Sequence, residues 1–240
     1  MSDKLDKYQK WLEIISDEVR GLTYSLDVWK QVTQIENSSS HFKKYGGHFQ
    51  HWQNQNYAYR MIMTLCKITN PENDDRHRDD RNFIKLLSEL KKKSYISFEQ
   101  FLKMYNQELP LLPKETFVTE SNGLKIYEVS ICLNDAKRKF EDITGYSYTK
   151  KDFSNMLEND ISKIENIFNS IKKLRNKKLA HLTNTNLEKV PNYNDIEKYV
   201  EILQKLVNKY CSIILNARIA FHFDNLNVKT VFEKAWIKND

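Results

Sequence analysis

An arginine and a histidine interrupt an apolar helical pattern in the segment between positions 172 and 181. Apolar residues before them recur at steps of four, three, four and three: Leu157, Ile161, Ile164, Phe168 and Ile171. Seven residues after Phe168 this pattern reaches Arg175, and the neighbouring register, through Ile167 and Leu174, reaches His181. Two polar side chains therefore occupy positions that should face protein.

Two interpretations of Arg175 follow from this placement. A buried guanidinium is costly unless it is paired, so one interpretation is a core arginine tied to a carboxylate. In the other, this end of the apolar stripe borders a cleft or a subunit interface, where Arg175 and His181 meet a ligand.

The pair suits the chemistry of metal-free RNA cleavage. A histidine titrates near neutrality and can take or give a proton, and an arginine can stabilise a phosphate that gains charge in the transition state. Residues 163–178 carry six basic side chains against one acidic one, a local charge of +5. We expect four of these cations to hold an RNA backbone without reading its sequence: Lys172, Lys173, Lys177 and Lys178.

Helix geometry favours a homodimer. Residues six apart on an ideal helix lie about 9 Å apart along its axis and roughly 120° around it. One copy of the Arg175 and His181 pair is therefore a loose site, whereas a twofold axis could bring two copies together into a compact one.

Composition predicts an all-α protein. The 240 residues include only 5 Gly and 4 Pro, are 40% hydrophobic and 29% charged, and suit a single domain, 1–240, with an irregular connection at 107–123. We expect a bundle of about six to eight helices whose apolar stripes face the core. The expected inward-facing residues are Tyr8, Leu12, Ile15, Val19, Leu22, Leu26, Trp29 and Val32 of the first helix; Ala58, Met61, Leu65 and Ile68 of the second; Ile126, Val129, Leu133, Ala136, Phe140 and Ile143 of the fifth; and Ile196, Val200, Leu203, Val207, Tyr210, Ile214 and Ala217 of the last long helix. The expected helices span Tyr8 to about residue 35, Trp52–Ile68, Asn82–Lys92, Ser97–Asn106, Leu124–Thr144, Thr149–His181, Asn194–Ala217 and a short piece around Val231 and Trp236.

The sequence also excludes several classes of protein. It lacks a signal-like apolar start and an apolar run of the roughly 20 residues that a membrane span needs, so we expect a cytoplasmic protein without a membrane partner. Its cysteines, Cys66, Cys132 and Cys211, lie far apart on apolar patterns and are expected to be free, buried thiols. Phosphate-loop, serine-hydrolase and zinc-protease motifs are absent.

No cofactor or metal site is expected. His41, His48 and His51 fall in an expected loop without nearby carboxylates and match no common zinc spacing. Tyr146 and Tyr148, at the start of the basic helix, are candidates for stacking on bases.

The run from Arg175 to His181, Arg-Asn-Lys-Lys-Leu-Ala-His, resembles the Arg-polar-x(3–5)-His signature of the HEPN superfamily. The wider segment, at the end of one long helix and before another, is similar to the AbiU-like abortive-infection branch. The resemblance implies a metal-independent endoribonuclease site at a dimer interface, with Arg175, Asn176 and His181 in the catalytic roles. Such proteins act in antiphage defence or in toxin–antitoxin pairs.

Two points stay open in this resemblance. Some relatives place a tyrosine two residues after the histidine, where a partner antitoxin modifies it, but this chain has Thr183 there. Some members are inactive as nucleases, so the alternative is a non-catalytic HEPN-like module that binds RNA or a partner protein.

Overall fold

The computed structural model describes residues 2–40, 47–71, 82–107, 123–175, 192–223 and 227–228. These parts contain seven α-helices and no strand. The helices are α1 (Ser2–Ser38), α3 (Gly47–Thr69), α4 (Phe83–Lys92), α5 (Phe98–Gln107), α6 (Gly123–Thr144), α7 (Ser154–Leu174) and α8 (Tyr193–Ile214). The expected all-α bundle of six to eight helices is thus confirmed.

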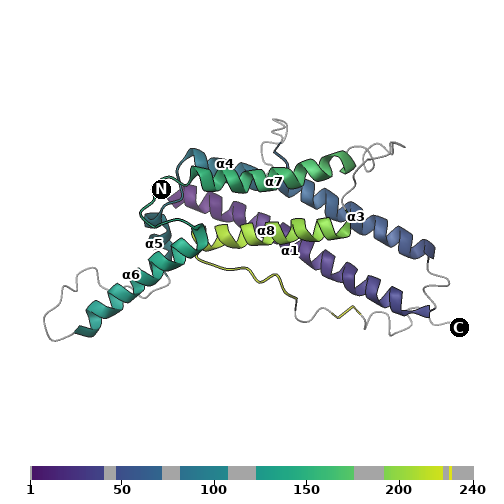
Figure 1. The fold of residues 1–240 in the computed structure, drawn as a ribbon, viewed down its shortest axis with the longest axis horizontal. Coiled ribbons are helices and arrows are strands. Elements are labelled where there is room, and N and C mark those ends of the chain that lie inside the picture. The colour runs from purple at the N-terminus through teal and green to yellow at the C-terminus, as the bar shows by residue number, and fades with distance from the viewer. Residues whose placement is uncertain are drawn as a thin grey trace.

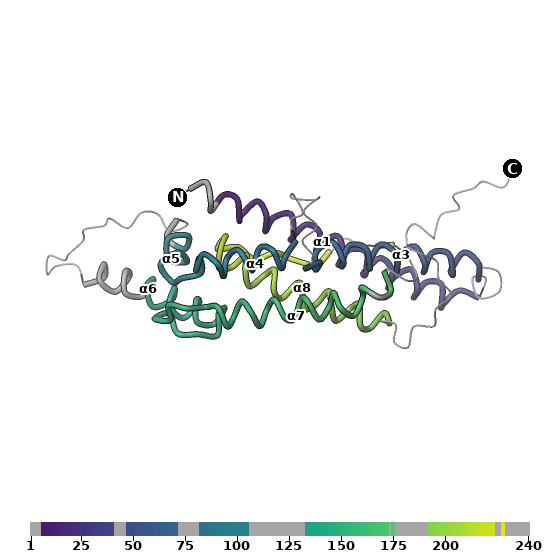
Figure 2. Tube along the Cα trace, turned by 90° about the horizontal axis from the view of Figure 1, so that it is seen from above, coloured from purple at the N-terminus to yellow at the C-terminus, as the bar shows by residue number. Residues whose placement is uncertain are grey.

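The bundle is elongated, with α1, α7 and α8 running along its length (Figure 1). Viewed from above, α3 and α4 follow one another along the same side (Figure 2). Helix α7 packs against both of them, and α1 packs against α3, α4 and α8. Helices α5 and α6 lie at the end of the bundle that holds the N-terminus (Figure 1).

The apolar stripes seen in the sequence form the core. On α1, the side chains of Leu12, Ile15, Val19 and Leu22 are at most 2% exposed. The six expected core positions within α8 are all buried as well: Ile196, Val200, Leu203, Val207, Tyr210 and Ile214. Burial of these amphipathic faces against one another is the main force that holds such a bundle together.

Helix ends follow local side-chain chemistry. The Asn82 side chain accepts a hydrogen bond from the backbone of Lys85 at the start of α4. Gly145 has a φ of 72° directly after α6, as expected for a C-terminal cap. Helix α8 begins with a capping box between Asn192 and Asp195, so the cap lies two residues before the expected Asn194.

Two other expected helix starts were wrong. Helix α3 begins at Gly47, five residues before Trp52, so its first turns include His48, Phe49 and His51. Helix α7 begins at Ser154 instead of Thr149, after an Asp152 carboxylate that accepts a hydrogen bond from the Ser154 backbone.

The end of α8 also differs from the expectation. The helix stops at Ile214, before Ala217, and Asn216 has a positive φ of 49°. The short helix expected around Val231 and Trp236 lies outside the described residues, as does the connection at 107–123 apart from its two helical ends. Within the part of the chain that is described, no helix has the length and apolar character needed to cross a membrane.

Candidate active site

The C-terminal end of α7 carries the described part of the predicted site. Ile164, Phe168 and Ile171 are at most 1% exposed, so the apolar stripe of α7 faces the protein as expected. At Arg175 the backbone is still helical, with φ −54° and ψ −54°, and its N–H donates to the carbonyl groups of Ile171 and Lys172. Arg175 itself is half-buried, which puts its side chain at the edge of the core.

The Phe168 ring holds two cations of the basic segment. The Arg175 Cζ atom lies 5.7 Å from the centre of this ring, and the Lys172 Nζ atom lies 5.6 Å from it. The three residues are four and three positions apart, so they share one side of α7. Both distances are within the range of a cation–π interaction, which orients a cation without neutralising it.

Arg175 also contacts the buried thiol of Cys66 on α3. Burial raises the pKa of Cys66 to about 11, although the Arg175 charge and a hydrogen bond from its guanidinium lower it. With a pKa this high, the thiol is protonated and uncharged at neutral pH. Cys66 therefore gives the guanidinium a neutral neighbour, and the contact joins the end of α7 to α3.

The remaining predicted site residues are not part of the described chain. Asn176, Lys177, Lys178 and His181 lie outside the described residues, as does the side chain of Lys173. The structure thus brings together Arg175 and Lys172, and the rest of the predicted motif stays a prediction.

The two candidate stacking tyrosines lie at the other end of α7. Tyr146 and Tyr148 precede the helix, which rises about 30 Å over its 21 residues before it reaches Arg175. Both pack against the core, and each ring is approached by a lysine: Lys150 Nζ lies 3.4 Å from the Tyr146 centroid, and Lys137 Nζ lies 4.7 Å from that of Tyr148. They are therefore separate from the Arg175 site.

The histidines expected in a loop belong to a helix instead. His48 and His51 are exposed on α3, and the His51 Nε2 atom lies 2.9 Å from the amide nitrogen of Gln55. His41 lies outside the described residues. Among the described residues, no cluster of three or more histidine, cysteine or acidic side chains could hold a metal ion.

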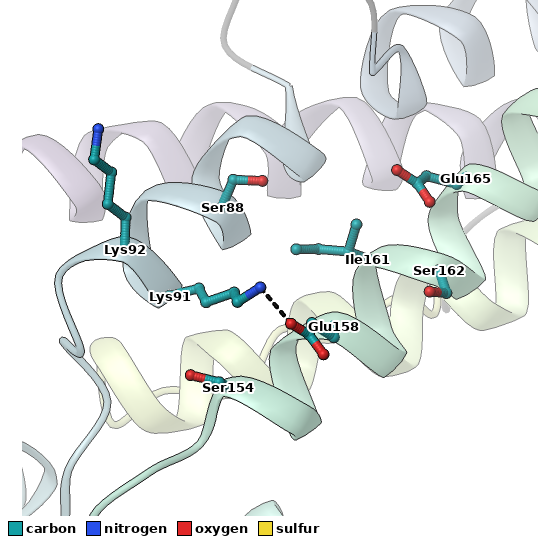
Figure 3. Close-up of a pocket in the computed structure, with 8 residues that line it drawn as sticks. All are labelled: Ser88, Lys91, Lys92, Ser154, Glu158, Ile161, Ser162 and Glu165. Carbon is teal, nitrogen blue, oxygen red and sulfur yellow. Dashed lines mark hydrogen bonds and ion pairs between the residues drawn. The ribbon is translucent and has the colours of Figure 1, made fainter.

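A groove between α4 and α7 was not foreseen from the sequence (Figure 3). It encloses about 610 Å³, and side chains of both signs line it, including the ion-paired Lys91 and Glu158. Glu165, at its far end, precedes Arg175 by ten residues, or about 15 Å along the helix. Sequence periodicity could not reveal this groove, because its lining combines the outer faces of two helices.

The comparison with family models covers nearly the whole chain. The model of the family HEPN_AbiU2, described as AbiU2, matches residues 5–238. The chain belongs to the AbiU2 family. The protein is therefore a HEPN domain of a family related to abortive infection. A search of curated proteins and a search of solved structures each found no match.

Proposed function

We propose that this AbiU2-family protein is a metal-independent endoribonuclease effector of an abortive-infection or toxin–antitoxin system. The observation that carries the proposal is the placement of Arg175. Its guanidinium is half-buried at the end of α7 and rests on the Phe168 ring beside Lys172. Arg175 also begins the Arg-Asn-x4-His motif of the chain.

In this proposal Arg175 stabilises the negative charge that develops on the phosphate during attack by the 2′-hydroxyl. Its contacts with the Phe168 ring and the protonated Cys66 thiol orient the guanidinium. His181 transfers a proton as general acid or base, and Asn176 orients the substrate or the histidine. Lys172, Lys173, Lys177 and Lys178 bind the RNA backbone as cations.

The proposed assembly is a homodimer, because on an ideal helix Arg175 and His181 would lie about 9 Å apart along the axis, too far apart to surround a single phosphate. An antitoxin protein is a further proposed partner.

The proposal is tested by incubating labelled total RNA and tRNA with the protein in EDTA. We expect wild-type protein to produce fragments with 2′,3′-cyclic phosphate ends and His181→Ala to produce none. The matched control is His51→Ala, which removes an exposed histidine of α3 and should cleave like wild type. Equal cleavage by the wild type and His181→Ala would refute the role of His181. Binding without cleavage by a folded wild-type dimer would favour the non-catalytic module instead.

A further inference from the structure

An exposed row of amide side chains runs along α7. This helix contains four asparagines in 21 residues, whereas α1 contains one in 37 and α8 contains two in 22. Asparagine is a poor helix former, so exposed helix positions usually carry alanine, lysine, glutamate or glutamine instead. The four asparagines and one serine recur at steps of four, three, four and three, and all five are exposed: Asn155, Asn159, Ser162, Asn166 and Asn169. We name these five residues the amide stripe.

The amide stripe faces away from the bundle. On a helix of 3.6 residues per turn it lies on the side opposite the buried Ile164, Phe168 and Ile171. Within the described part of the chain, none of its five side chains forms a hydrogen bond with another residue. The donors and acceptors of these side chains are therefore turned toward solvent, where a ligand can reach them.

At its C-terminal end, the amide stripe leads to the proposed catalytic segment. The next position at the same spacing is Lys173, four residues after Asn169. The neighbouring Lys172 and Arg175 are held on the Phe168 ring. A strand bound at Arg175 can therefore continue along the stripe toward the start of α7.

The N-terminal end of the amide stripe is basic as well. Lys92, at the end of α4, and Lys151, just before α7, are exposed, and Lys92 lines the groove of Figure 3 together with Ser154. Asn155 precedes Arg175 by 20 residues, or about 30 Å along the helix. Two groups of cations at this distance, joined by uncharged amides, match a polyanion that extends along the helix.

The contact along the stripe itself is made by hydrogen bonds. Two carboxylates flank the stripe on the side of the groove, Glu158 in an ion pair with Lys91 and Glu165 at the far end, whereas the stripe carries no charge. Asparagine and serine side chains bind the phosphates and sugars of nucleic acids. An amide both donates and accepts, and so does the 2′-hydroxyl of RNA.

We infer that the amide stripe binds an RNA strand and guides it from the N-terminal end of α7 to Arg175. The cations at both ends favour RNA over a protein as the occupant. The inference rests on the proposed function for the cleavage at Arg175, and it deepens that function by naming the class of substrate. The substrate is an RNA long enough to cover about 30 Å of α7, in preference to a short oligonucleotide.

The test is the binding of labelled tRNA to the full chain, measured by fluorescence anisotropy with His181→Ala as the parent so that the RNA stays intact. The double variant Asn159→Ala with Asn166→Ala should bind about tenfold more weakly, as expected for two lost hydrogen bonds. Asn56→Ala with Asn134→Ala is the matched control, because it removes two exposed amides from α3 and α6 and should bind like the parent. Alanine is the better helix former, so circular dichroism should show full helical content in every variant.

The salt dependence of binding separates hydrogen bonds from charge. The variant with Asn159→Ala and Asn166→Ala should keep the parent's slope of log affinity against log salt concentration, whereas Lys172→Ala should reduce this slope by about 0.7. Absence of tRNA binding by the parent, equal affinities of the parent and the asparagine variant, or a reduced slope for that variant would overturn the inference. A change in its mass by light scattering would overturn it too, because the stripe would then contact a second copy of the chain.

RNA cleavage is scored separately, with the substitutions placed in the wild type. The asparagine variant should lose kcat/KM on tRNA and keep it on a trinucleotide, which is too short to reach from Arg175 to Asn155. Equal kcat/KM of wild type and variant on tRNA refutes only the role of the stripe. A protein that binds tRNA through the stripe and cleaves no RNA refutes only the proposed function.

Discussion

Replacing Asp160 by asparagine removes the charge at the centre of a buried network between α7 and α8. The Asp160 residue is 1% exposed, and its carboxylate accepts hydrogen bonds from Lys163 at 2.8 Å, Lys209 at 2.6 Å and the Tyr210 hydroxyl at 3.0 Å. Burial raises the pKa of Tyr210, and the neighbouring carboxylate adds to this effect, so Tyr210 stays protonated and donates. Asparagine has nearly the same shape but keeps only one acceptor oxygen and no charge.

The expected loss of unfolding free energy depends on how deeply each partner of Asp160 is buried. Removing one member of a buried ion pair costs about 3–5 kcal/mol, because the other charge stays buried. Lys209 is 19% exposed and Lys163 is 48% exposed, so water partly solvates both cations after the substitution. We therefore expect the lower end, about 3 kcal/mol, or a melting temperature lower by roughly 6–12 °C. Tyr210→Phe removes a single charged hydrogen bond and should cost about 1.5 kcal/mol.

The assay is urea unfolding followed by circular dichroism, at one protein concentration for all variants. Glu158→Gln is the control. Glu158 lies on α7 like Asp160, but the substitution breaks only an exposed ion pair with Lys91 of α4 and should cost less than about 0.5 kcal/mol. If Asp160→Asn destabilises the protein no more than Glu158→Gln, the reasoning about the buried network is refuted.

The same network predicts a dependence on pH. Burial raises the pKa of Asp160, but hydrogen bonds and charge from Lys163 and Lys209 outweigh it, so the folded pKa lies below the ordinary value. A lowered carboxyl pKa contributes stability above the unfolded pKa of about 3.9 and loses it as the pH falls through the folded value. The stability difference between wild type and Asp160→Asn should thus be constant from pH 7 to about pH 4 and shrink below it. A difference that is already smaller at pH 6 would contradict this assignment.

Two further predictions concern thiols and glycines. Cys66 and Cys211 are buried, and burial raises the pKa of both thiols. A thiol reagent at pH 8 should therefore label at most one of the three cysteines in the folded protein and all three in denaturant. Two labelled thiols in the folded state would disprove this prediction. Gly145→Ala should destabilise the protein by about 1 kcal/mol, because an alanine at φ 72° is strained. Gly21→Ala, inside α1 with open space around the added Cβ, should instead stabilise it by about 0.5–1 kcal/mol, and denaturant midpoints compare the two.

The sequence predicted which segments form helices better than it predicted which faces of those helices are covered by other helices. A stripe at steps of three and four identifies an amphipathic helix wherever it occurs, and the expected core of α8 was correct at every position inside the helix. On α6 the same pattern predicted an inward-facing Leu133, which is 37% exposed, whereas Ala136 and Phe140 of that stripe are fully buried. Periodicity defines a face of a helix, but only the arrangement of the other helices decides which part of the face is covered.

The first half of α3 shows the same limit, since Phe49 is 50% exposed and Trp52 is 60% exposed. Ala58, Met61, Leu65 and Ile68 were expected to face inward; the last three are buried and Ala58 is half-buried. The aromatic residues Phe49 and Trp52 were not singled out. The other side of this part of α3 is covered by α1 and α8, because Asn54 accepts hydrogen bonds from Trp29 and Tyr193. A contact between distant segments of this kind has no local signal in the sequence.

The orientation of Arg175 likewise depends on several helices at once. Near its start, α7 is tied to α4 by the Lys91–Glu158 pair, and two residues later Asp160 ties it to α8. At its end, the guanidinium lies over Phe168 of the same helix and against Cys66 of α3. The spacing of the sequence marks Arg175 as an exception in an apolar stripe. It could not predict that Arg175 contacts Cys66, because that contact depends on how α3 and α7 pack. An arginine held at the edge of the core by an aromatic ring and a thiol is oriented by the fold, and a fixed orientation of this cation is what the proposed catalysis requires.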